Sequence, residues 1–121
     1  MNTNSETLVS LNRGIGTITL NRPDKKNALT RDMYAAISEL IRQADTDPEL
    51  RVLVITGAGG DFTAGNDLND FLNNPDTDSD SATADFLLTL AETTVPIVAA
   101  VEGLAIGVGT TLLAHCDFVY A

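Results

Sequence analysis

Two short extended stretches open the patterned part of the chain. Apolar and β-branched residues dominate positions 7–12 and 15–20, and Asn12-Arg13-Gly14 separates the two stretches. Because glycine permits a tight reversal, this pattern predicts a β-hairpin. Pro23 ends the second stretch, and the polar residues 24–27 after it are expected to form a loop.

A helical spacing of apolar residues follows this loop. Apolar side chains recur every three or four positions from Met33 to Ala44, Thr30 precedes them as an N-cap candidate, and Pro48 limits the helix at its far end. The nearly continuous apolar runs 51–56 and 96–101 predict strands that are covered on both faces, in a parallel or mixed sheet.

The remaining segments complete an α/β order of elements. The pattern predicts a short extended piece within residues 61–68, a mobile acidic loop and the start of a last strand, and it predicts helices in three places. The acidic loop spans residues 73–81, the last strand begins at 117–121, and the helices lie at 69–72, 84–91 and 107–115. The resulting order, β-β-α-β-β-α(α)-β-α-β, suggests a repeating ββα unit.

Composition narrows the possible functions. The 121 residues fit one domain or part of a larger one, and a net charge of −10 argues against a nucleic-acid partner. The longest apolar run is too short to cross a bilayer, and the N-terminus lacks the pattern of a signal peptide. We therefore expect a cytoplasmic protein with no membrane partner.

Several candidate sites fail on their spacing. A single cysteine, Cys116, and a single histidine, His115, leave no disulfide within the chain and no metal site, so both residues are expected to pack in the core. The glycines that begin at Gly57 and at Gly107 lack the third glycine of a dinucleotide loop. The aspartates of the acidic loop lack the glycine and glutamate of a calcium loop.

Two glycine-bearing turns remain as candidates for chemistry. FTAGNDL (62–68) and EGLAIGVG (102–109) each turn the chain just before an expected helix. Unpaired N–H groups at two such turns could together bind a developing oxyanion, and glycine would let a ligand carbonyl approach the backbone closely. On spacing alone, two ordinary helix starts remain the simpler interpretation.

Three motifs in order resemble the enoyl-CoA hydratase/isomerase family, the crotonase fold. They are NRPDKKNAL (21–29), FTAGNDL (62–68) and the segment 95–121. The resemblance implies an α/β, crotonase-like (ClpP/crotonase) spiral of ββα units, of which residues 1–121 would be a truncated N-terminal part. It also implies an acyl-CoA thioester substrate, no cofactor beyond the coenzyme A of that substrate, and a homo-oligomer that is a trimer or a pair of trimers.

The resemblance assigns roles to individual positions. The oxyanion-hole donors would be the backbone N–H groups of Asn66 and Val108. Contacts with the substrate and its coenzyme A would come from residues in and beside the motifs: Lys25, Lys26, Ala28, Ala64, Gly65, Asp67, Leu68 and Gly107. Asp67 is also expected to cap or stabilise the short helix that follows it.

One departure from the family pattern bears on the reaction. Thr111 stands where the family's hydratases carry a glutamate, and GNDL with IGVGTTLL resembles the Δ3,Δ2-enoyl-CoA isomerase branch. In that branch one carboxylate moves a proton from C2 to C4, and it lies beyond the CDFVYA strand, so the isolated chain is expected to be inactive. The alternatives are a hydratase, a thioester hydrolase, a decarboxylase or a dehalogenase of the same family, or a truncated, non-catalytic chain or subunit.

Overall fold

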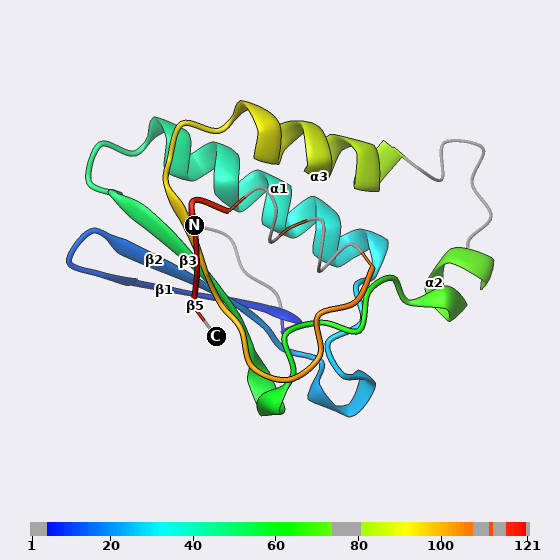
Figure 1. Ribbon diagram of the computed structural model, residues 1–121. Helices are drawn as coiled ribbons and strands as arrows, with labels where there is room; N and C mark the ends of the chain where they lie inside the picture. The colour runs from blue at the N-terminus through cyan, green and yellow to red at the C-terminus, as the bar shows by residue number, and fades with distance from the viewer. Residues whose placement is uncertain (1–4, 74–80, 108–111, 113–115, 121) are drawn as a thin grey trace.

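The computed structural model describes residues 5–73, 81–107, 112 and 116–120, and its centre is a five-stranded sheet (Figure 1). The strands lie in the order β1-β2-β3-β4-β5, in which β1 and β2 are antiparallel and every later pair is parallel. Their bounds are β1 Thr7–Asn12, β2 Ile15–Leu20, β3 Val52–Gly57, β4 Ile97–Ala100 and β5 Phe118–Tyr120. The predicted hairpin, the two apolar-run strands and the last strand are therefore confirmed.

Helices cover one face of this sheet. Figure 1 shows α1 and α3 side by side above the strands, with α2 set apart beyond the end of the sheet. Their bounds are α1 Arg31–Thr46, α2 Leu68–Asn73 and α3 Ser81–Glu92, and two short 3-10 turns are η1 Pro23–Lys25 and η2 Ala58–Gly60. Of the acidic loop expected at 73–81, residues 74–80 lie outside the described residues, as does most of the expected helix 107–115, whereas Asn73 ends α2 and Ser81 begins α3.

Helix α1 has the start that its sequence predicts. The Thr30 side chain accepts a hydrogen bond of 3.2 Å from the Met33 N–H, which satisfies one of the donors left free in the first turn. The apolar stripe of the helix is buried against the strands and α3, and each large side chain buried there contributes about 1.5–3 kcal/mol to stability. This burial fixes the start of α1, and with it the loop that leads into the helix.

Two expectations about the extended segments need correction. Residues 61–68 form no regular strand among the described residues, and instead make two single parallel bridges, Thr63 with Ala105 and Leu29 with Asn66. The strands are also not covered equally on both faces. In β3, Leu53 and Ile55 are buried under the helices, whereas side chains on the opposite face are only half-buried by the described residues.

None of the described helices combines the length and the apolar character that crossing a bilayer requires.

Candidate functional site

The two glycine-bearing turns of the sequence lie against each other. The Thr63 N–H donates to the Leu104 carbonyl at 2.9 Å, and the Ile106 N–H donates back to the Thr63 carbonyl at 3.1 Å. Gly65 has a φ of +92°, and a Cβ placed on it would lie 3.0 Å from the Ile106 carbonyl oxygen and 3.9 Å from the Gly107 Cα. Glycine is therefore needed at position 65, both for its backbone conformation and for this close approach.

In the first turn, the Asn66 N–H differs from the neighbouring backbone N–H groups in its hydrogen bonding. The Ala64 N–H donates to the Lys26 carbonyl at 3.0 Å, the Gly65 N–H to the Thr63 Oγ1 at 3.1 Å, and the Asp67 N–H to the Leu29 carbonyl at 2.9 Å. The Asn66 N–H, between them, donates to no atom of the described residues. It is thus available to a ligand as far as the described part of the chain is concerned.

The direction of this N–H follows from peptide geometry. The Gly65 carbonyl accepts a 2.7 Å hydrogen bond from the Leu29 N–H, and the peptide bond between Gly65 and Asn66 is trans. In a trans peptide the C=O and the following N–H point in opposite directions. The Asn66 N–H therefore points away from the segment of Leu29, as a donor to an incoming oxygen must. Val108, the other predicted donor, lies outside the described residues.

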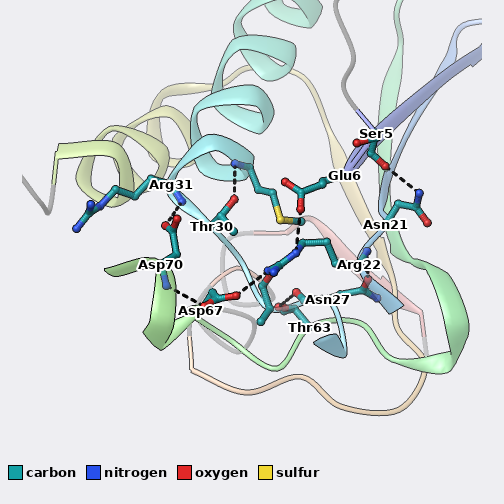
Figure 2. Close-up of polar contacts among 12 residues, drawn as sticks. Ser5, Glu6, Asn21, Arg22, Asn27, Thr30, Arg31, Thr63, Asp67 and Asp70 are labelled. Carbon is teal, nitrogen blue, oxygen red and sulfur yellow. Dashed lines mark hydrogen bonds and ion pairs between the residues drawn. The ribbon is translucent and has the colours of Figure 1, made fainter. Parts of the chain in front are cut away.

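A buried asparagine holds the loops around this turn. Asn27 has no exposed surface, and Figure 2 shows it beside Arg22 and Thr63. Its Oδ1 accepts from the Arg22 N–H at 2.8 Å, and its Nδ2 donates to the carbonyls of Ala58 and Asp61 at 2.9 and 2.7 Å. The Thr63 hydroxyl donates to its carbonyl at 2.6 Å. The Asn27 side chain thus joins its own loop to the segment 58–61 at the end of the sheet, and its carbonyl adds the contact with Thr63.

A charged pair fixes the turn from its other side. Arg22 lies 2.9 Å from an Asp67 carboxylate oxygen and also forms an ion pair with Glu6 at 3.0 Å (Figure 2). The second Asp67 oxygen accepts from the Asp70 N–H at 2.9 Å, which confirms that Asp67 caps α2. The Asp70 N–H and then the Arg22 guanidinium hold the pKa of Asp67 below its usual value. Both Asp67 oxygens are therefore engaged within the protein.

The other predicted contact residues surround the same turn. Lys25 and Lys26 are exposed on and just after η1, and the Lys26 carbonyl anchors Ala64 as described above. Ala28 and Ala64 are half-buried, whereas Leu68 is 72% exposed at the start of α2. The structure thus places the lysine loop (residues 24–27), the AGN turn (residues 64–66) and the start of the second turn (residues 102–107) next to one another. That these residues contact a substrate stays a prediction.

Cys116 takes no part in this arrangement. It packs against the hydrophobic core, as predicted, and burial followed by the nearby Asp117 charge raises the pKa of its thiol to about 11. A thiol with this pKa is protonated at neutral pH and is a poor nucleophile or metal ligand. No group of three or more His, Cys, Asp or Glu side chains that could hold a metal is found within the described part of the chain. His115 lies outside that part.

Sequence reasoning missed three residues of the site. The sequence places Asn27 only in a loop and Tyr34 only within the apolar stripe of the helix, and it gives Arg22 no role. Asn27 has a φ of +57°, a conformation that asparagine tolerates better than most residues, so its place in a turn-rich segment was a weak signal. The Tyr34 hydroxyl donates to the Asn66 Oδ1, which no local pattern in the sequence indicates.

A family model and two curated relatives match almost the whole of this chain. The family model described as enoyl-CoA hydratase/isomerase matches residues 10–121. The chain is 36% identical to the 1,2-epoxyphenylacetyl-CoA isomerase of Escherichia coli and 39% identical to enoyl-CoA delta isomerase 2 of Rattus norvegicus. The aligned regions cover 94% of this chain in both cases, but 46% and 30% of the two relatives.

A hydratase and a solved structure extend this comparison. The enoyl-CoA hydratase EchA19 of Mycobacterium tuberculosis is 39% identical over 83% of this chain and 40% of its own length. The structure of Pseudomonas aeruginosa OdaA is 46% identical, with a TM-score of 0.89 over 96% of this chain and 47% of the other. The chain therefore spans less than half the length of these relatives. Fold and sequence agree that the chain belongs to the enoyl-CoA hydratase/isomerase family, with the crotonase fold.

Proposed function

We propose that the protein containing this chain is an enoyl-CoA isomerase that moves the double bond of a 3-enoyl-CoA to the 2-position. The observation that carries the proposal is the Asn66 N–H, which has no acceptor among the described residues and points away from Leu29. It lies in a turn packed against Ile106 and Gly107. This chain would supply the thioester-binding part of the active site.

The chemistry places specific demands on that part. Removal of a proton from C2 of the substrate puts negative charge on the thioester oxygen, and the proton is then returned at C4. Each backbone N–H aimed at that oxygen can contribute roughly 3–4 kcal/mol to the stability of the transition state. The Asn66 N–H would be one donor and the Val108 N–H the other. The general base would be a carboxylate outside residues 1–121.

Charge supports the assignment of the coenzyme A end. Lys25 and Lys26 are exposed side chains in a chain with 7 basic and 17 acidic residues, and they lie on the loop that anchors the AGN turn. A phosphate-bearing ligand would be repelled by most of this surface and attracted to the lysine loop. The loop would hold the nucleotide while the thioester reaches the turn.

Assembly as a trimer or a pair of trimers stays a prediction.

The isomerase reaction is favoured over hydration by one residue. Hydration needs one carboxylate to activate the water and another to protonate the carbon. Thr111 stands where the family's hydratases carry one of these carboxylates. The rat relative is named an isomerase and the mycobacterial relative a hydratase, so the family alone permits both reactions.

An enzyme assay separates these outcomes. The complete product of the gene that encodes this chain is mixed with a 3-enoyl-CoA, and the conjugated 2-enoyl thioester is followed by its ultraviolet absorbance. A parallel reaction supplies a 2-enoyl-CoA and measures the 3-hydroxyacyl product. We expect isomerisation to dominate. Hydration without isomerisation would overturn the isomerase assignment and leave the family unchanged.

A further inference from the structure

We propose that Tyr34 is a positioning residue that fixes the direction of the Asn66 N–H before a substrate binds. The inference deepens the proposed function and rests on it, because it gives Tyr34 a role in the rate of that reaction. The observation behind it is a hydrogen bond from the buried Tyr34 hydroxyl to the side chain of Asn66, whose backbone N–H has no acceptor among the described residues.

Tyr34 is held rigidly by the core. It lies in the first turns of α1, has no exposed surface, and its ring contacts Phe86 of α3 with a centroid distance of 5.2 Å and an interplanar angle of 54°. A ring packed between two helices cannot move without opening the core. Its hydroxyl is therefore a fixed point from which the exposed Asn66 is held.

The Gly65–Asn66 peptide is consequently held at two places. The Leu29 N–H donates to the carbonyl of this peptide, on Gly65, at 2.7 Å. The Tyr34 hydroxyl donates to the side chain of Asn66, the residue that carries the N–H of the same peptide. Leu29 and Tyr34 flank the Thr30 cap, so both contacts come from the anchored start of one helix. Rotation of the peptide would break at least one of them. A donor fixed in this way needs no reorganisation when charge develops on the substrate.

The protonation state suits this role. Burial raises the pKa of Tyr34 well above its ordinary value, so the hydroxyl stays protonated throughout the range in which enzymes are assayed. The Asn66 Oδ1 can only accept a hydrogen bond, and it receives one from a group that remains a donor. The contact should therefore not depend on pH below about 10, the ordinary pKa of tyrosine.

The test is a double-mutant cycle in the complete gene product. Tyr34→Phe removes the hydroxyl and keeps the packed ring, and Asn66→Ala removes the acceptor and keeps the backbone N–H. Tyr120→Phe is the matched control, because Tyr120 is 77% exposed on β5. The values of kcat and KM for a 3-enoyl-CoA and the thermal unfolding midpoint are measured for each variant.

We expect Tyr34→Phe to lower kcat by about 3- to 10-fold, the range given by losing the net free energy of one hydrogen bond, with KM changed less than about twofold. Adding Tyr34→Phe to Asn66→Ala should give the same kcat as Asn66→Ala alone, because the Tyr34 hydroxyl then has no Asn66 side chain to hold. Tyr120→Phe should match the wild type.

Three other results would overturn the inference. An unchanged kcat in Tyr34→Phe, or an equal loss of kcat with and without the Asn66 side chain, would make Tyr34 a purely structural residue while the proposed function stands. If the wild type converts no enoyl-CoA, the proposed function fails, and the role assigned to Tyr34 fails with it.

Discussion

Replacing Asn27 with alanine should destabilise the protein strongly, although the residue lies in a loop. The side chain makes three hydrogen bonds, to the Arg22 N–H and to the carbonyls of Ala58 and Asp61, and it is fully buried. Each bond contributes about 1 kcal/mol net, and the partners left behind are part-buried. Alanine at a φ of +57° adds about 1 kcal/mol of strain. The free energy of unfolding should therefore fall by about 4 kcal/mol, a large part of the 5–15 kcal/mol that is typical of a folded domain.

The assay is equilibrium unfolding in urea, with two controls. Asn27→Gly removes the same hydrogen bonds without the strain, so it should cost somewhat less than Asn27→Ala. Lys26→Ala changes the preceding residue, which has a similar φ of +52° but an exposed side chain, and should change the free energy of unfolding by less than about 0.5 kcal/mol. A loss below about 1 kcal/mol for Asn27→Ala would refute the reasoning that the three part-buried hydrogen bonds of the Asn27 side chain hold its own loop against the segment 58–61.

Three further substitutions test the site and its support. Gly65→Ala should cost at least about 1–2 kcal/mol in urea unfolding and lower kcat, because its φ is +92°; unchanged kinetics would contradict a tight turn at the donor. Changing Lys25 and Lys26 together to alanine should raise KM for an acyl-CoA mainly at low salt, with kcat retained; an equal KM at low salt would remove these lysines from the coenzyme A site. Asp67 has a lowered pKa, so its stabilisation is present above its unfolded pKa of about 3.9 and is lost as pH falls through the lower folded value. Acid unfolding of Asp67→Asn should therefore depend less on pH below about 4 than that of the wild type, and parallel curves would contradict this.

The sequence was sufficient for elements whose pattern is local. The hairpin, the Thr30 cap and the apolar stripe of α1 follow from the residues that form them, because turn chemistry and periodicity act over a few positions. The extended piece expected after β3 is no regular strand, because its backbone pairs only at single bridges with residues about 40 positions away, Ala105 and Leu29. No local signal encodes such a partner.

The candidate site divides in the same way. The AGN turn could be chosen because glycine at position 65 and a family motif coincide there. The roles of Asn27 and Tyr34 could not be predicted, since each depends on contacts with loops or helices remote in sequence. A buried polar side chain becomes recognisable only once its partners are placed around it.

The central claim is that the Asn66 N–H receives the thioester oxygen of an acyl-CoA. A crystal structure of the complete gene product with a non-reactive acyl-CoA analogue tests it most directly. We expect the thioester oxygen about 2.7–3.1 Å from the Asn66 nitrogen, on the side facing away from Leu29. A thioester oxygen bound elsewhere, with the Asn66 N–H donating to another part of the protein, would contradict the account.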